Sequence, residues 1–180
     1  MQKLKVRNSL IAAVLEQAKK FSWGKIADIM STALMKATLG HLNLRDINLI
    51  IFPDWTQPEE TVGWELQEII KNLVTHPDRA EMTWLVDNSN ITAEDADLIL
   101  SSVAMNLLME EELEVDEGPE IVLLGELSQI QWSALITQLQ GRIKLEHENG
   151  EAIAQLKAEN IPVIELNNSV SYTHLRAHET

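Results

Sequence analysis

Cysteine is absent from this sequence, and so are long apolar runs. The lack of cysteine excludes disulfide bonds, thiolate metal ligands and a cysteine nucleophile, and it fits the reducing cytoplasm, where we expect the protein to reside. No apolar run approaches the roughly 20 residues that a membrane-spanning helix needs. The N-terminus also lacks the uninterrupted apolar core of a signal peptide. We therefore expect no membrane span and no export.

Phosphate-binding loops and common catalytic motifs are missing as well. No G-x-G-x-x-G or Walker-type loop follows any predicted strand, so the usual glycine cradle for a nucleotide phosphate is not encoded. His41, His76 and His147 are far apart and lack the spacing of a metal site. No Ser-His-Asp order with a nucleophile elbow occurs either. The sequence thus predicts no metal and no permanently bound cofactor, and it identifies no catalytic residue.

Basic residues are scarce, and most of them lie at one end. The 180-residue chain has a formal net charge of −14 and is 45% hydrophobic, enough for a sizeable core. Residues 1–45 contain eight Lys or Arg and two Asp or Glu, a net +6, whereas residues 46–169 contain five and 25, a net −20. A module with that charge repels nucleic acid and anionic membranes, so we expect neither as a partner. High solubility is the simplest reason for the acidity.

Short apolar segments alternate with amphipathic segments between residues 46 and 169. The first, residues 47–52, is apolar at nearly every position, which is typical of a parallel strand buried on both faces. Further strands are predicted at 82–86, 121–125, 142–145 and 161–165, and helices at 58–75, 92–107, 128–139 and 150–158. The connections are long enough for right-handed crossovers. We predict an α/β, Rossmann-like, mostly parallel five-stranded sheet with helices on both faces, preceded by a two-helix N-terminal segment.

Local signals mark where several of these elements begin and end. In the N-terminal segment, residues 8–9 can cap one helix, Ser22 can cap a second and Gly40 can end it. Ser128 with Gln131 has the capping-box pattern, and Thr92 with Asp95 resembles it. Because Pro162 has no amide donor, the last strand should lie at an edge or begin pairing only at Val163. Three tryptophans are predicted to be core residues: Trp64, Trp84 and Trp132.

Ligands of open α/β sheets bind beyond the carboxyl ends of the strands, so the residues there are the candidate site. Asp54 and Trp55 follow the first strand. They could offer a carboxylate to a sugar hydroxyl and an aromatic face to its ring, or they could form a turn and close the sheet edge. Asp87, Asn88, Ser89 and Asn90 form a polar cluster after the second strand. It suits ribose or sugar hydroxyls, but Asp and Asn are equally ordinary turn residues.

Two further candidates follow the third and fourth strands. Gly125 would let a backbone approach a ligand beside Glu126, although a tight turn explains the glycine as well. His147, between Glu146 and Glu148, could act as a general base or bind a phosphate through a protonated ring. A solvated histidine in a charged loop is the alternative.

Three stretches of the sequence suggest a family. Residues 52–60 (FPDWTQPEE), 85–91 (LVDNSNI) and 101–111 (SSVAMNLLMEE) resemble a domain of large cyanobacterial glycosyltransferase proteins, where it accompanies tetratricopeptide repeats or glycosyltransferase modules. Residues 21–27 (FSWGKIA) resemble the closing helix of a retaining family-4-type transferase. The resemblance implies a two-Rossmann-domain glycosyltransferase that uses a nucleotide sugar as donor and no active-site metal. Its implied partners are the nucleotide sugar or a glycan, and other modules of the same full-length protein.

The sequence departs from that family in one respect. Retaining enzymes of this type contact the donor sugar through an E-x7-E motif, and no glycine-flanked version of it follows a strand here. Two interpretations stay open: part of the glycosyl-transfer machinery, inactive as this chain alone, or a non-catalytic protein- or glycan-binding module attached to a transferase. A flavodoxin-like small-molecule enzyme is a third, which the missing phosphate loop disfavours.

The ends of the chain carry a separate expectation. Residues 170–180 resemble the translation of a transposase-type sequencing adapter, so we expect a non-native tail and a reading frame cut near Ser169. On this interpretation, residues 1–45 are the closing helices of a preceding glycosyltransferase module. Residues 46–169 are then an acidic Rossmann-like domain that is itself truncated.

Overall fold

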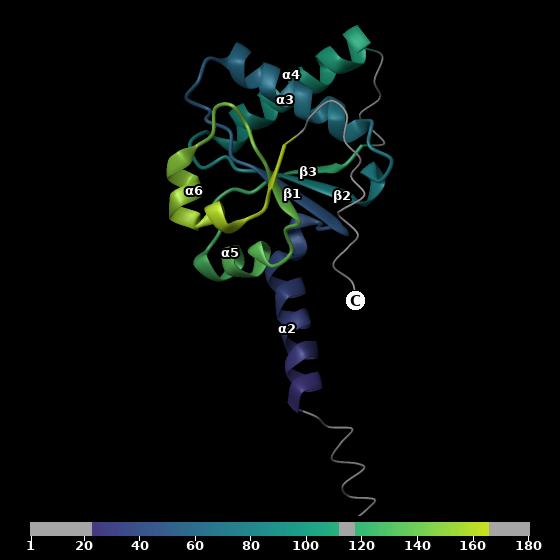
Figure 1. Cartoon of the computed structure of the whole chain (residues 1–180), viewed down its shortest axis with the longest axis vertical. Coiled ribbons are helices and arrows are strands. Elements are labelled where there is room, and N and C mark those ends of the chain that lie inside the picture. Colours follow the sequence, from purple (N-terminus) through teal and green to yellow (C-terminus); the bar gives the residue numbers. More distant parts are fainter. Residues whose placement is uncertain (1–22, 112–117, 166–180) are drawn as a thin grey trace, which may run out of the picture. The chain divides into compact units, whose positions relative to one another are not determined.

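A computed structural model describes residues 23–111 and 118–165 (Figure 1). The helix predicted after residues 8–9 and the tail 170–180 lie outside these ranges. The chain divides into two compact units, Met1–Gly40 and His41–Thr180. In the first unit, α2 (Trp23–Leu39) ends where Gly40 was predicted to end it, and the short 3-10 helix η1 (Gly40–Leu42) follows. Within the described residues, no helix is long and apolar enough to cross a membrane.

The second unit is built on a five-stranded sheet in which every pair of neighbouring strands is parallel. The strands are β1 (Ile47–Ile51), β2 (Met82–Val86), β3 (Glu120–Leu123), β4 (Gly141–Ile143) and β5 (Val163–Ile164). Their spatial order is β3-β2-β1-β4-β5. This confirms the predicted Rossmann-like α/β fold. Strands β2 and β3 are added on one side of β1, and β4 and β5 are added on the other side. The topological switch point therefore lies between β1 and β4.

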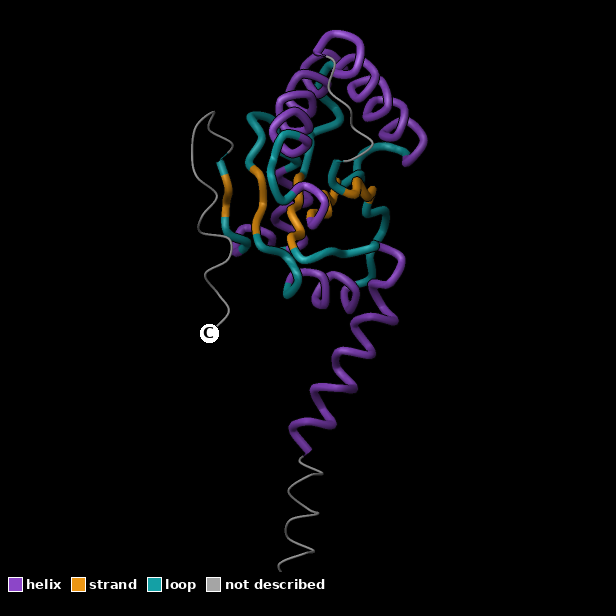
Figure 2. The backbone as a smooth tube through the Cα atoms, turned by 90° about the vertical axis from the view of Figure 1, so that its right-hand side faces the viewer, coloured by secondary structure: helices purple, strands orange, loops and turns teal. Residues whose placement is uncertain are grey.

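Helices cover both faces of the sheet (Figures 1 and 2). On one face lie α3 (Glu59–Val74) and α4 (Ala93–Glu111), and on the other lie α5 (Gln129–Ile136) and α6 (Gly150–Leu156). Successive side chains of β1 point to opposite faces of the sheet, so the strand packs against the helices on both faces. Leu49 and Ile51 join the core that includes α3 and α4, whereas Phe52 meets the ring of Trp132 on α5 edge to face, with centroids 6.2 Å apart.

Three of the predicted local signals of the second unit are present. Ser128 and Gln131 form a reciprocal capping box at the start of α5. The hydroxyl of Thr92 accepts a hydrogen bond from the amide of Asp95 at 3.1 Å. The last strand, β5, lies at an edge of the sheet and begins pairing at Val163, as the missing amide of Pro162 predicted. Each of these features depends only on residues that are close together in the sequence.

The prediction that Trp64 is a core residue is wrong. Its side chain is 68% exposed, whereas Trp84 and Trp132 are buried as predicted. The reason is helical geometry. Trp64 precedes the fully buried Leu66 by two residues, and two residues turn an α-helix by about 200°, which places the indole on the outer side of α3.

Candidate functional site

Asp54 lies at the carboxyl end of β1 and accepts several hydrogen bonds. Its carboxylate receives the side-chain amide of Gln57 at 2.7 Å, the hydroxyl of Thr56 at 2.6 Å and the amide of Asn90 at 3.4 Å. The bonds from Gln57 and Thr56 lower the pKa of Asp54 below its ordinary value. Asp54 is therefore a carboxylate at neutral pH, and it is only half buried.

Asp87, at the end of β2, is buried and belongs to the same edge of the sheet. It accepts a 2.7 Å hydrogen bond from the hydroxyl of Ser89, whose oxygen accepts one of 3.2 Å from the side chain of Asn149. Burial raises the pKa of Asp87, and the bonds from Ser89 oppose that rise. Asn149 also caps α6. We refer to these five residues from the ends of β1 and β2 and the start of α6 as the carboxyl-edge cluster: Asp54, Asp87, Ser89, Asn90 and Asn149.

Trp55 does not offer its ring to a ligand. The residue is 8% exposed and packs in the core, and its indole N–H donates to the backbone carbonyl of Asp87 at 2.8 Å. The predicted stacking role is thus replaced by the alternative, in which Trp55 closes the sheet edge. The physical reason is that burying the large indole is favourable once its polar N–H has a partner.

Asn88 and Gly125 connect the ends of β2 and β3. The side-chain oxygen of the buried Asn88 accepts the Gly125 amide at 2.7 Å. Gly125 has a φ of +60°, the left-handed conformation that glycine adopts at little cost. Glu126, the next residue, is exposed. This geometry favours the tight turn over a backbone approach to a ligand.

Backbone hydrogen bonds close the crevice at the switch point. The amide of Asp54 donates to the carbonyl of His147 at 3.1 Å, and the amide of Asn149 donates to the carbonyl of Phe52 at 2.9 Å. An isolated antiparallel bridge pairs Pro53 with Glu148 between them. Open α/β folds bind ligands in this crevice. Here the chain fills it with its own backbone.

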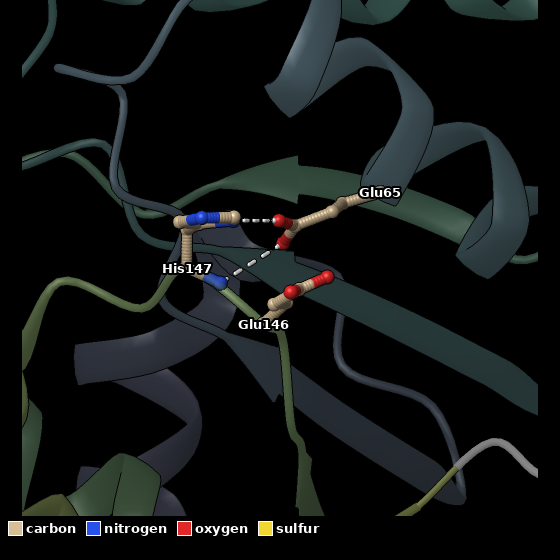
Figure 3. Close-up of side chains that lie close together, drawn as sticks. All are labelled: Glu65, Glu146 and His147. Carbon is tan, nitrogen blue, oxygen red and sulfur yellow. Dashed lines mark hydrogen bonds and ion pairs between the residues drawn. The ribbon is translucent and has the colours of Figure 1, made fainter.

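His147 is paired with a residue that the sequence did not single out. Its Nδ1 lies 2.5 Å from Oε1 of Glu65, on α3, and Glu146 lies beside them (Figure 3). The hydrogen bond with Glu65 raises the pKa of His147. One ligand atom from each of the three residues lies within 4.8 Å of the others. The expectation of no metal-binding group did not foresee this cluster, and no spacing could have shown it, since Glu65 is 82 positions away.

The helix N-termini at this edge disfavour phosphate. The first turns of three helices carry acidic residues: Glu59 and Glu60 on α3, Glu94 and Asp95 on α4, and Glu151 on α6. The fourth helix, α5, is capped by its own Ser128 side chain. A helix N-terminus attracts anions through its positive potential and its free amides. Here carboxylates in the first turn already offset that potential, or a side-chain cap already bonds an amide.

Two surface hollows adjoin α3. A groove of about 710 Å³ lies between α3 and α4 and includes Gly63, Trp64 and Ser102. A second, of about 430 Å³, lies between α3 and the ends of β4 and β5. The charged residues that line it are four carboxylates and one ammonium: Glu65, Glu68, Glu146, Glu165 and Lys144. The second groove is therefore an environment for a cation.

No protein-family model, no curated protein and no solved structure matches the chain.

Proposed function

We propose that residues 46–169 form an accessory α/β domain of a cytoplasmic glycosyltransferase protein, and that this domain binds a glycan without carrying the transfer chemistry. The carboxyl-edge cluster is the observation that carries the proposal. The glycosyltransferase context comes from the resemblance of residues 52–60, 85–91 and 101–111 to domains of such proteins.

The exposed members of the carboxyl-edge cluster suit sugar hydroxyls. A hydroxyl both donates and accepts, so it pairs well with a carboxylate and an amide side by side. Asp54 supplies the acceptor and Asn90, which is exposed, supplies the donor. Their mutual contact of 3.4 Å is long for a hydrogen bond, so exchanging it for bonds to a ligand costs little. Ser89 and Asn149 extend the same polar surface.

The nucleotide of a donor sugar has no comparable place in the described part of the chain. The switch-point crevice is closed by the bonds of Asp54 and Asn149, and the neighbouring helix N-termini are acidic or capped. Phosphate groups would be repelled there. In this proposal, any nucleotide sugar is held by another module of the full-length protein. The second candidate, a catalytic lobe that binds the donor, rests on the family resemblance alone.

The test is a titration of the chain followed through its backbone amide signals by NMR. The ligands are a panel of neutral oligosaccharides and, separately, UDP-glucose and GDP-mannose. We expect saturable shifts of the Asp54 and Asn90 amides with an oligosaccharide and none with the nucleotide sugars. The variants Asp54→Ala and Asn90→Ala should abolish the shifts.

The matched control is Asn160→Ala, since Asn160 is an exposed asparagine of the 3-10 helix that precedes β5, away from the cluster. That variant should bind the oligosaccharide as the parent does. Saturable binding of a nucleotide sugar at Asp54 would replace the proposal by the catalytic lobe. Binding of no sugar by a folded chain would exclude both.

A further inference from the structure

We propose that Glu65, Glu146 and His147 form a binding site for a divalent transition-metal ion, with Zn²⁺ as the best match. This site shares no side chain with the carboxyl-edge cluster and does not depend on the glycan-binding proposal. Imidazole nitrogen and carboxylate oxygen are both ordinary zinc ligands, and three protein ligands with one open position are typical of zinc sites that act on a further ligand.

The spacing of the three ligand atoms fits one ion. In a tetrahedral zinc site, metal–ligand distances of about 2.0–2.2 Å place neighbouring ligand atoms about 3.3–3.6 Å apart. The Glu65 and His147 atoms, now 2.5 Å apart, must separate slightly, and the remaining atoms, all within 4.8 Å of one another, must approach. The ion would replace the direct hydrogen bond between Glu65 and His147.

Two of the three ligands are held in place by the fold. The Glu65 side chain is 17% exposed, and its second oxygen accepts the backbone amide of His147 at 3.4 Å. The carbonyl of His147 is fixed by the amide of Asp54. Glu146 is exposed and lies beside the other two side chains (Figure 3). Such preorganisation lowers the entropic cost of binding.

The surroundings favour a cation and leave it accessible. Glu65 and Glu146 line the groove of about 430 Å³, which also holds Glu68 and Glu165 against the single charge of Lys144. The negative potential of the unit raises the local concentration of cations. Because Glu65 and Glu146 line this groove, an ion that they bind with His147 would lie at its edge.

The experiment uses the full chain, freed of metal by a chelator and dialysis, with Zn²⁺ alone as the probe. Competition with a chromogenic chelator at pH 7.5 should reveal one saturable site, and Co²⁺ in place of Zn²⁺ should give the visible absorption of a low-symmetry site. His147→Ala and Glu65→Gln should weaken binding at least tenfold. Glu146→Gln, a change at an exposed residue that does not threaten the fold, should weaken it as well.

Glu68→Gln is the matched control, because Glu68 shares α3 and the same groove but lies outside the cluster. Its affinity should stay within twofold of the parent. The proposal is overturned if no saturable site appears, or if His147→Ala binds Zn²⁺ as tightly as the parent while remaining folded. Asn90→Ala should leave zinc binding unchanged, so failure here and failure of glycan binding are distinguishable.

Discussion

The backbone amide of Asp54 donates a hydrogen bond of 3.1 Å to the carbonyl of His147 and thereby joins the chain that leaves β1 to the chain that leaves β4. These two strands flank the topological switch point. In nucleotide-binding sheets of this order, the two chains diverge there and the ligand lies between them. This bond and the bond from the Asn149 amide to the Phe52 carbonyl close the crevice in which such sheets bind a ligand. We refer to the two bonds as the seam.

Hydrogen exchange should report this seam. We expect the amides of Asp54 and Asn149 to exchange as slowly as those of β1, because opening them requires separation of two strand ends. The amide of Thr56, which bonds only the exposed side of the Asp54 carboxylate, should exchange much faster. Exchange of Asp54 and Asn149 at the rate of Thr56 would mean that the crevice opens readily enough to admit a nucleotide.

The buried carboxyl of Asp87 should make stability depend on pH. Its pKa in the folded chain is raised by burial, so the charged form is costly there, and the protein should gain stability as pH falls through that folded pKa towards the unfolded value near 3.8. In Asp87→Asn this contribution is absent. We subtract the free energy of unfolding of the variant from that of the parent, both measured by urea denaturation. This difference should increase as the pH is lowered from 7 to 4.

Ser89 provides the internal check on that prediction. Its hydrogen bonds favour the charged form of Asp87, so Ser89→Ala should move the dependence to higher pH. If the difference in free energy of unfolding between parent and Asp87→Asn stays constant or falls on acidification, burial does not penalise the charged form of Asp87.

Gly141 should tolerate no side chain. A Cβ there would overlap the side chain of Ile164 in the neighbouring strand and lie 3.2 Å from the carbonyl of Pro162. We expect Gly141→Ala to lower the free energy of unfolding by about 1–3 kcal/mol, the usual cost of overpacking.

Gly150→Ala is the matched control, because a Cβ at Gly150 meets nothing within 4 Å and the residue opens α6. Alanine should leave stability unchanged or raise it by about 0.5 kcal/mol. If Gly141→Ala costs no more than Gly150→Ala in urea denaturation, β5 does not pack on β4 as described.

The capping box of α5 can be tested in the same way. Ser128→Ala removes the acceptor of the Gln131 amide and should cost about 1 kcal/mol of stability. Ser133→Ala removes a hydroxyl that only donates back to the carbonyl of Gln129, so it should cost nothing or stabilise slightly. Thermal melts of both variants should show a lower midpoint for Ser128→Ala alone. Equal midpoints for the two variants would show that the Ser128 cap does not stabilise the protein.

Two tryptophans show where prediction from the sequence succeeds and where it does not. Trp55 and Trp64 are chemically alike, yet one is 8% exposed and the other 68%. The helical period around Leu66 contains the signal that places Trp64 outward. Nothing local to Trp55 indicates that its N–H would find the carbonyl of Asp87, since that contact depends on β1 and β2 lying side by side.

The sequence by itself determined the elements and their parallel arrangement. Continuous apolar strands, capped helices and the missing amide of Pro162 act over a few residues, and the alternation of strand and helix leaves few topologies open. Only the tertiary structure decided which polar groups meet. Glu65 and His147 are 82 positions apart, and Asp54 and Asn90 are 36 apart. Contacts at such separations arise from the packing of whole elements, and no spacing within one segment encodes them.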